Sequence, residues 1–292
     1  MDVTIVGVGK VGGALAIALT KANHQIRQMI VRNCKIAGRV RSIIGAQVDI
    51  HTWKSVRTID SSLVLICTGD SEITNVAETL KNFLVPGQVV LHTSGSLPST
   101  ILGPLSAIGC ETGSLHPLVS VSDPIKGSNS LERVYFCIEG STRAVSVSRK
   151  IARDIGGKPF TIPTDKKALY HASAVTVAGH MVALFAAGVE MLQACGISES
   201  EARKVLLPLS KSSLENLSTQ SPGKALTGTF ARLDVDGLAR HIAAFDAIPA
   251  DLREVYYLLG EQSLSLLEQS SNTDPRIGEM RRLIFVAKAK RR

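Results

Sequence analysis

The feature that most constrains this chain is a glycine-rich turn directly after its first apolar segment. Val3-Thr-Ile-Val6 is typical of a strand, and a helical pattern begins soon afterwards. Between them, Gly7 allows a tight turn, Gly9 lets the backbone approach a pyrophosphate, and Gly12 lets helix and strand pack closely. The helix N-terminus then offers free N–H groups to phosphate. The alternative is an ordinary glycine-rich turn. In this context the pattern predicts a dinucleotide site formed by Gly7, Val8, Gly9, Lys10, Val11 and Gly12.

Short β-branched segments alternate with helical patterns through residues 2–162. The expected strands are Val3–Val6, Ile26–Val31, Gln47–Ile50, Leu63–Thr68, Val89–His92, Glu111–Leu115, Val134–Glu139 and Pro159–Ile162. Helical patterns at Val11–Ala22 and Ile73–Phe83 separate some of these strands, and Ser120–Ser130 is typical of a loop. Near-continuous apolar strands that alternate with helices indicate a parallel sheet covered on both faces.

The pattern changes after Pro163. Residues 164–292 lack convincing strands and contain long helical patterns, one of which begins with the capping box Ser198-Glu-Ser-Glu201. The predicted fold class is therefore α/β, a Rossmann-type doubly wound, mostly parallel sheet over residues 1–163. An all-α C-terminal domain follows over residues 164–292.

The composition favours a soluble globular protein, since the 292 residues are 45% hydrophobic and 20% charged. The five cysteines include no CxxC pair, so we expect free thiols, no metal site and a reducing, cytoplasmic environment. No signal-peptide pattern precedes the first strand. The net charge of +8 favours anionic ligands, but part of it lies in the tail Lys288–Arg292 and the few aromatic residues are scattered. We therefore expect no nucleic-acid surface.

An apolar helical segment follows the predicted domain boundary. Ala172–Val189 carries no formal charge, but it is slightly shorter than the about 20 residues of a membrane span and contains polar residues, among them His180. We expect no membrane span, and instead a helix buried in the helical domain or in a homodimer. Lys167 and His171 are four residues apart, so they share one face near the start of this helix.

The end of the second strand discriminates between the two nicotinamide cofactors. An NAD site usually places Asp or Glu about 20 residues after the glycines, against the ribose 2′-hydroxyl. Here the strand ends at Arg32 and Asn33 with no carboxylate nearby. A guanidinium can bind a 2′-phosphate through two parallel hydrogen bonds, and Lys10, Lys35 or Arg39 would add charge. We predict NADP, bound by Arg32 and Asn33; the alternative for Arg32 is a solvated surface residue.

Polar side chains also follow later strands, where ligands of open α/β sheets bind. We expect Thr68 and Asp70 near the cofactor, and Ser94 near the place where a hydride would leave. His116 could donate a hydrogen bond to a substrate carbonyl or hydroxyl. The alternatives are that Asp70 caps a helix, that Ser94 satisfies a turn, and that His116 is structural.

Three further motifs are more specific than the glycine turn: Ser114-Leu-His-Pro-Leu118, Leu169-Tyr-His-Ala172 and Ala225–Arg232. With them, nearly the whole chain resembles Rossmann-like proteins whose helical C-terminal domain is of unknown function. These are relatives of pyrroline-carboxylate reductase and of deazaflavin-dependent NADP oxidoreductases, in the 6-phosphogluconate-dehydrogenase-like superfamily. The resemblance implies an NADP(H)-binding domain, a helical domain that dimerises, and a substrate cleft between them.

The resemblance also implies roles for individual residues. His116 is similar to the His-Pro histidine of prephenate dehydrogenases, which contacts the reacting hydroxyl. Lys167 falls where hydroxyacid dehydrogenases carry the lysine of a Lys-x-x-x-Asn pattern, although His171 stands here in place of the asparagine. The resemblance further implies that the segment Leu226–Arg232, with Asp234 and His241, reaches the cleft; the alternative for Arg232 is an ordinary surface charge.

The predicted function is that of an NADP(H)-dependent reductase or dehydrogenase for a small, anionic substrate. The expected catalytic residues are His116, Lys167, His171 and Ser94. Of these, His116 and Lys167 would polarise or protonate the reacting group, and His171 would orient one of them. The alternative is a non-catalytic NADP(H)-binding sensor or regulatory module, which the missing asparagine favours.

Overall fold

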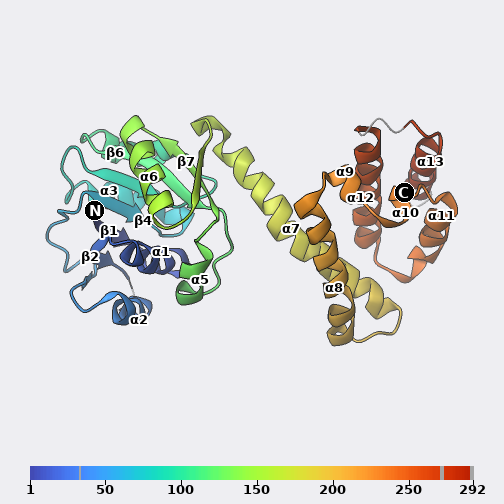
Figure 1. The fold of residues 1–292 in the computed structure, drawn as a ribbon, viewed down its shortest axis with the longest axis horizontal. Coiled ribbons are helices and arrows are strands. Elements are labelled where there is room, and N and C mark those ends of the chain that lie inside the picture. The colour runs from blue at the N-terminus through green and yellow to red at the C-terminus, as the bar shows by residue number, and fades with distance from the viewer. Residues whose placement is uncertain (33, 270–272, 290–292) are drawn as a thin grey trace. The chain divides into compact units, whose positions relative to one another are not determined.

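The computed structural model describes residues 1–32, 34–269 and 273–289 (Figure 1). Its strands are β1 (Asp2–Val6), β2 (Gln25–Ile30), β3 (Asp49–His51), β4 (Leu63–Ile66), β5 (Val89–His92), β6 (Glu111–Pro117), β7 (Tyr135–Gly140) and β8 (Lys158–Thr161). Its α-helices are α1 (Lys10–Lys21), α2 (Cys34–Ile44), α3 (Ile73–Leu80), α4 (Gly103–Ser106), α5 (Pro124–Ser130), α6 (Thr142–Asp154), α7 (Lys167–Ala194), α8 (Glu199–Thr219), α9 (Pro222–Ala225), α10 (Gly228–Ala231), α11 (Val235–Ala244), α12 (Ala250–Gln269) and α13 (Arg276–Ala289). Short 3₁₀ helices are η1 (Asp70–Glu72), η2 (Ser99–Leu102), η3 (Thr164–Lys166) and η4 (Phe245–Ala247).

The strands form one sheet in the order β3-β2-β1-β4-β5-β6-β7-β8. Neighbouring strands are parallel except β6 and β7, which are antiparallel. All of the predicted strands are present, and the Rossmann-type, mostly parallel fold class is confirmed. The chain passes from β1 outward to β3 and then returns to β4 on the other side of β1. The carboxyl ends of β1 and β4 therefore flank the point where the strand order reverses, which is where ligands of such sheets bind.

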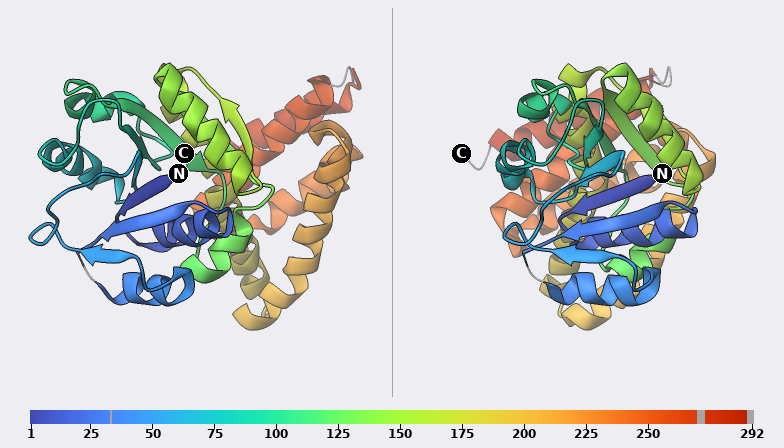
Figure 2. Two further views of the ribbon diagram at one scale, coloured as in Figure 1. Left: turned by 60° about the vertical axis from the view of Figure 1, so that its left-hand side comes forward. Right: turned by 90° about the vertical axis from the view of Figure 1, so that its left-hand side faces the viewer.

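Helices cover both faces of this sheet, as the prediction required (Figure 2). Successive residues of β4 face opposite layers, with Leu63 and Leu65 in one apolar core and Val64 and Ile66 in the other. The first core includes side chains of α1, α2 and α6, and the second includes side chains of α3, η2 and α4. The strand is buried on both faces, which explains its continuous apolar sequence.

The prediction of a loop over Ser120–Ser130 is wrong for its second half, which forms α5. The helix begins after Asp123, whose carboxylate accepts hydrogen bonds from the backbone N–H groups of Ile125 and Lys126. Pro124 stands at the first helical position, where no N–H is needed. The Gly, Ser and Asn residues of the segment concealed this helix, although the Asp-Pro pair is a helix-start signal.

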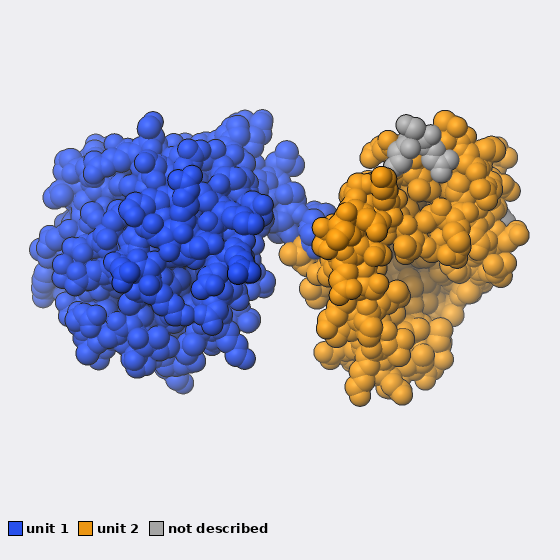
Figure 3. Space-filling model, in the orientation of Figure 1, with its two compact units in different colours: residues 1–177 blue, residues 178–292 orange. Residues whose placement is uncertain are grey.

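The chain divides into two compact units, Met1–Val177 and Ala178–Arg292 (Figure 3). The division falls inside α7, whereas the predicted boundary after residue 163 lies between β8 and η3. The second unit is helical, which confirms the expected all-α C-terminal region. Its core is built from α11, α12 and α13, with Leu238, Tyr257, Leu264, Met280 and Ile284 fully or almost fully buried.

One described helical segment, Thr164–Ala194, is long and apolar enough to cross a membrane, judged by length and composition alone. The most apolar window of this segment has a mean hydropathy of 1.7, and only 6% of it is buried within the chain. Exposed apolar side chains on α7 include Val177 and Val182. Near its C-terminal end, Ala187 and Val189 of α7 are buried, and Ala187 belongs to the core of the second unit. Burial of the remaining apolar side chains of α7, in a homodimer, stays a prediction.

Candidate active site

The three glycines of the turn after β1 meet three different steric demands. Gly7 has φ +90°, a conformation that favours glycine, and a Cβ atom there would lie 2.8 Å from Thr68 Cγ2. A Cβ atom at Gly12 would collide with the carbonyl oxygen of Gly7, because α1 packs directly on the turn. At Gly9 a Cβ atom would meet nothing within 4 Å. The fold therefore needs Gly7 and Gly12, whereas Gly9 leaves an open approach to the backbone, as a pyrophosphate site requires.

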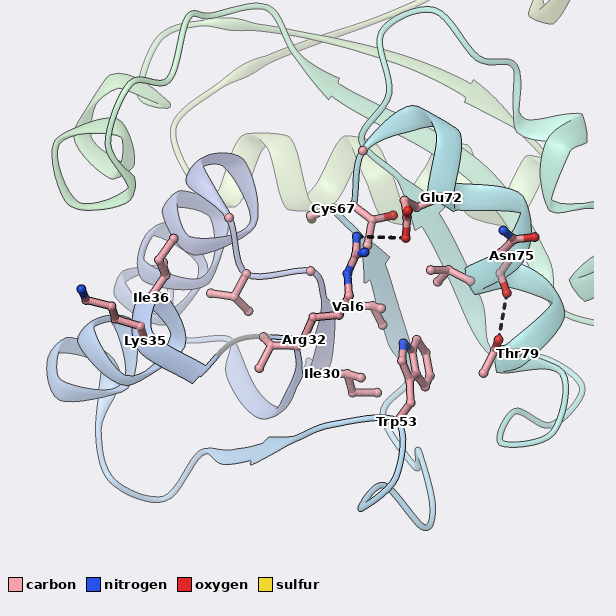
Figure 4. Close-up of a pocket in the computed structure, with 17 residues that line it drawn as sticks. Val6, Ile30, Arg32, Lys35, Ile36, Trp53, Cys67, Glu72, Asn75 and Thr79 are labelled. Atoms are coloured by element: carbon pink, nitrogen blue, oxygen red, sulfur yellow. Dashed lines mark hydrogen bonds and ion pairs between the residues drawn. The ribbon is translucent and has the colours of Figure 1, made fainter.

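A pocket of about 580 Å³ lies beside this turn (Figure 4). The residues that line it are Val6, Gly7, Val8, Gly9, Ile30, Val31, Arg32, Lys35, Ile36, Trp53, Cys67, Thr68, Gly69, Glu72, Asn75, Val76 and Thr79. The lining thus includes Gly7, Val8, Gly9, Arg32 and Thr68 of the predicted cofactor residues. Those outside it are Lys10, Val11, Gly12 and Asp70. The start of α1 carries no acidic residue in its first turn, so nothing there opposes a bound phosphate.

Arg32 extends from the end of β2 into this pocket and contacts a carboxylate (Figure 4). Its Nη2 atom lies 2.9 Å from Glu72 Oε2, and the two side chains are 73% and 40% exposed. Asn33, the other residue predicted beside the 2′-phosphate, lies outside the described residues. Lys35 lines the same pocket. The predicted arginine therefore stands at the pocket as expected, but with a negatively charged partner that the sequence pattern did not indicate.

Thr68 and Asp70 follow β4 and continue the site away from the glycine turn. The Thr68 hydroxyl oxygen is buried and has no hydrogen-bond partner among the described residues. The Asp70 carboxylate accepts hydrogen bonds from the hydroxyls of Ser94 (2.8 Å) and Ser96 (2.9 Å). Neither η1 nor α3 has a side-chain cap, so the alternative reading of Asp70 as a helix cap is wrong. Asp70 instead ties the end of β4 to the loop after β5.

Ser94 lies at the centre of that loop and is only 6% exposed. Besides donating to Asp70, its hydroxyl accepts hydrogen bonds from the backbone N–H groups of Ser96 (3.2 Å) and Leu97 (3.0 Å). These three bonds fix the turn, as the structural alternative for this residue expected. In this conformation the Ser94 hydroxyl is engaged within the protein.

His116 and His171 both face Gly95, the residue after Ser94. A Cβ atom at Gly95 would lie 2.9 Å from His116 Nε2 and would collide with His171 Nδ1. The two imidazole rings are 5.8 Å apart and nearly perpendicular. His171 Nδ1 is buried without a hydrogen-bond partner in the described part of the chain. On the other side of His116, its Nδ1 atom lies 2.8 Å from the Tyr170 hydroxyl. Two imidazoles, held by β6 and α7, thus converge beside the loop after β5.

Lys167 opens α7 and is buried, with 1% of its surface exposed. Its ammonium donates a hydrogen bond of 2.6 Å to the Ser114 hydroxyl on β6, which in turn donates to the backbone oxygen of Ser94. Burial lowers the pKa of Lys167 from its ordinary value. Lys167 therefore lies near the strand ends, where its positive charge is connected through Ser114 to the loop after β5.

Burial also keeps the imidazoles of His116 and His92 uncharged at neutral pH. It lowers the pKa of His116 to about 4, and the positive charge of Lys167 contributes further in the same direction. The same two causes, in the same order, lower the pKa of His92 to about 4. Burial raises the pKa of the Tyr170 phenol, so this group keeps its proton. At pH 7 the cluster therefore holds a neutral His116 beside a protonated phenol.

The residues that the resemblance assigned to a cleft have partners within the second unit. Asp234 caps α11 by accepting a hydrogen bond of 2.8 Å from the backbone N–H of Gly237. His241 Nδ1 lies 2.7 Å from the Tyr256 hydroxyl. Arg232 ends α10 as its C-terminal cap residue. These contacts give Asp234 and His241 structural roles in the helical unit.

Sequence reasoning assigned no site role to Glu72, Trp53, Tyr170 or Ser114. A signal was available for Tyr170, which stands three residues after Lys167 and so near the same helical face. A signal was also available for Ser114, which stands two residues before His116 in an extended segment, so both side chains are expected on one face of the sheet. Trp53 and Glu72 follow β3 and β4, and only the strand order brings them to Arg32.

Two family models match the chain. Residues 1–117 match a Rossmann-like domain, and residues 134–263 match a domain of unknown function, DUF2520. A search of curated proteins finds no match.

The fold is similar to several solved structures at low sequence identity. A protein of Thermotoga maritima is 23% identical, with a TM-score of 0.75 over 92% of this chain and 100% of that chain. A candidate NADP oxidoreductase of Bacteroides fragilis is 20% identical, with a TM-score of 0.71 over 90% and 97%. The reductive aminase of Aspergillus terreus, solved with NADPH and ethyl levulinate, is 17% identical, with a TM-score of 0.57 over 100% and 94%. These likenesses show a shared fold. The two family models confirm the resemblance seen in the sequence: a Rossmann-like domain at residues 1–117 is followed by a match to DUF2520 at residues 134–263.

Proposed function

We propose that the protein is an NADP(H)-dependent oxidoreductase that acts on a small anionic substrate. The observation that carries the proposal is that two sites are neighbours within the unit Met1–Val177. The pocket beside Gly9 reaches Thr68 and Gly69, and the next residue, Asp70, accepts a hydrogen bond from Ser94, in the loop that faces His116 and His171. A pocket suited to a dinucleotide thus ends close to a cluster of side chains that can carry protons. A candidate NADP oxidoreductase and a reductive aminase solved with NADPH, both of the same fold, support this proposal.

The cofactor would be held by the residues of the pocket. The backbone at Gly9 and the N-terminus of α1 would bind the pyrophosphate, and Arg32 would bind the 2′-phosphate. The unpartnered hydroxyl of Thr68 would donate or accept a hydrogen bond farther along the strand ends. When bound, the nicotinamide group supplies or accepts the hydride.

The neutral imidazole of His116 would transfer the proton that accompanies the hydride. A Tyr170 phenol that donates to His116 Nδ1 leaves the proton of the neutral imidazole on Nε2, the atom that faces Gly95. His116 can then donate a hydrogen bond to a developing alkoxide or amine. The charge on the buried Lys167 favours a negative group nearby, which is why we propose an anionic substrate.

The test uses nucleotide binding before turnover. Trp53 is the single tryptophan of the chain and lines the pocket, so its fluorescence reports binding directly. We expect NADPH to bind more tightly than NADH, and Arg32→Ala to weaken NADPH binding about tenfold or more while leaving NADH binding little changed. Failure of both nucleotides to change the fluorescence or to bind calorimetrically would contradict the proposal.

Catalysis is tested separately with Lys167→Ala and the more conservative Lys167→Met, because truncation of a buried lysine can destabilise the unit. Both variants should keep NADPH affinity, measured through Trp53, and lose most turnover with any substrate found by screening NADPH oxidation. Turnover equal to that of the wild type in a folded variant would remove Lys167 from the mechanism.

A non-catalytic NADP(H) sensor is the second candidate. It is favoured by the full burial of Lys167 and by the internal hydrogen bonds of Ser94, which leave neither group exposed to a ligand. The two candidates differ in one outcome. An enzyme oxidises NADPH in the presence of some carbonyl or imine compound, whereas a sensor binds NADPH and oxidises none of a broad panel.

We also infer a cytoplasmic homodimer formed through the helical domain. The five free cysteines agree with a reducing compartment, and the exposed apolar side chains of α7 need a partner. Light scattering should give a mass twice the 31.1 kDa of the chain. Val182→Glu should reduce this mass to that of one chain.

A further inference from the structure

We propose that Glu72 sets the cofactor preference of the pocket, by opposing a 2′-phosphate at Arg32 and accepting a hydrogen bond from an unmodified ribose 2′-hydroxyl. The proposal rests on the proposed dinucleotide-binding function. It predicts that the wild-type pocket accepts both NADP(H) and NAD(H), with a smaller preference for NADP(H) than Arg32 alone would give.

The first argument is the geometry of the pair. Arg32 Nη2 and Glu72 Oε2 are 2.9 Å apart, and both side chains line the pocket (Figure 4). A ribose phosphate that binds the Arg32 guanidinium must therefore displace the Glu72 carboxylate or lie beside it. A carboxylate at this place does what the acid at the end of the second strand does in NAD sites, which is to accept a hydrogen bond from the 2′-hydroxyl. Here that acid comes from η1, after β4, instead of from β2.

The second argument is the charge of the lining. Among the described residues that line the pocket, Arg32 and Lys35 are cationic and Glu72 is the one carboxylate. Two positive charges and one negative charge leave a formal charge of +1, and removing the carboxylate raises it to +2. A phosphate monoester carries about −1.5 to −2 charges at pH 7. Glu72 therefore halves the formal charge that the 2′-phosphate meets.

The third argument concerns the size of the effect. Arg32 is 73% exposed and Glu72 is 40% exposed, so their ion pair lies in water and is screened by salt. Such a pair opens easily, and Glu72 can rotate away when a 2′-phosphate binds. We therefore expect Glu72 to adjust the preference by about three- to tenfold instead of excluding either cofactor.

The test compares two ligands that differ in one group, 5′-AMP and adenosine 2′,5′-bisphosphate. Both are titrated by calorimetry and by Trp53 fluorescence into the wild-type protein and Glu72→Gln. The variant keeps the shape of the side chain and removes its charge. We expect it to bind the bisphosphate three- to tenfold more tightly and 5′-AMP equally or more weakly. The gain should shrink when salt is raised from about 0.05 to 0.5 M, because the opposing charge is exposed.

A matched control is Glu78→Gln, on α3. Glu78 is an exposed acid paired with Lys81 at 3.1 Å, and it does not line the pocket. It should leave the ratio of the two affinities within twofold of the wild-type ratio. In Arg32→Ala the Glu72→Gln substitution should still favour the bisphosphate, but by a smaller factor, because the guanidinium no longer competes.

The outcomes separate the two proposals. If the wild-type protein binds neither ligand, the pocket is not a nucleotide site and both proposals fail. If both ligands bind and Glu72→Gln leaves their affinity ratio unchanged, or shifts it no more than Glu78→Gln does, the role of Glu72 is overturned while the dinucleotide site stands.

Discussion

Acidification should destabilise the first unit through imidazoles that the fold buries uncharged, of which His92 is the clearer case. His92 is fully buried, and its Nδ1 accepts a hydrogen bond of 3.2 Å from the backbone N–H of Ser94. Burial first, and the charge of Lys167 second, lower its pKa to about 4. In the unfolded chain a histidine titrates near 6.5. Between these values the unfolded state binds a proton that the folded state does not, so stability falls as pH falls from about 6.5 to 4.

The magnitude follows from the width of this window. Each pH unit corresponds to about 1.4 kcal/mol for one proton, so His92 should contribute a loss of about 3 kcal/mol across the window. A domain has about 5–15 kcal/mol of unfolding free energy in total, so this loss is readily measured. His116 should act in the same direction, because its pKa is also about 4.

The assay is urea unfolding followed by Trp53 fluorescence, which reports on the unit Met1–Val177. It compares the wild type with His92→Asn, in which the amide oxygen can still accept the Ser94 hydrogen bond. At pH 7.5 the difference in unfolding free energy gives the packing cost of the substitution alone. At pH 4.5 the advantage of the wild type should shrink by about 2–3 kcal/mol. If the difference in unfolding free energy between the wild type and His92→Asn stays constant within about 0.5 kcal/mol between the two pH values, the assignment of a buried neutral His92 is refuted.

Three further results are expected. Gly9→Ala should fold with near-normal stability and lose nucleotide binding, because the new Cβ meets no protein atom but lies where the pyrophosphate would approach. Gly12→Ala should lower the free energy of unfolding by about 1–3 kcal/mol or fail to fold, because its Cβ meets the backbone of Gly7. Urea unfolding and calorimetry test this pair of variants, and normal NADPH binding by Gly9→Ala would contradict the reasoning. Tyr170→Phe should lower kcat and shift the pH profile of kcat with little change in nucleotide affinity, because the phenol contacts His116. An unshifted profile would count against the role of Tyr170 in fixing the tautomer of His116. In native protein a thiol reagent should label Cys34 and Cys195 quickly, because both are exposed. Cys110 and Cys137 should react only after unfolding, because they are buried and burial raises the pKa of their thiols; fast labelling of either one, detected by mass spectrometry, would contradict this.

The sheet was predictable because its signals are local. Each strand is a short apolar segment between helical patterns, and the strand limits differ from expectation by a few residues at most. Pro117 was expected just beyond a strand, yet it is the last residue of β6 and lies opposite Phe136 of the antiparallel β7. Proline is tolerated at such an end because a lost N–H there costs few ladder bonds. Nothing in the local sequence indicates that β7 runs antiparallel to β6.

The candidate site was predictable only in part, because its residues meet through tertiary structure. The pattern around Arg32 indicated a phosphate-binding arginine, but its partner Glu72 stands 40 residues later and reaches it only because β4 lies next to β1. Ser94 was expected near the reaction centre, and this role stays a prediction; its hydroxyl also accepts two backbone hydrogen bonds that fix the turn, which only the structure shows. Lys167 lies beside Ser114, close to the predicted site. Its burial was not predictable from the sequence, because the charged residues Asp165 and Lys166 directly before it are typical of an exposed helix start.

The placement of the division inside α7 means that the family matches and the compact units have different boundaries. Lys167 and His171 precede Val177, so they belong to the unit that carries the glycine turn. The DUF2520 match, residues 134–263, nevertheless contains both of them, and the Rossmann-like match ends at residue 117. A fragment that ends between the two matches would lack β7 and β8 of the sheet, and also Lys167, which donates a hydrogen bond to Ser114. A shortened form of this protein should therefore end within or after α7, so that the whole sheet and the start of that helix stay together.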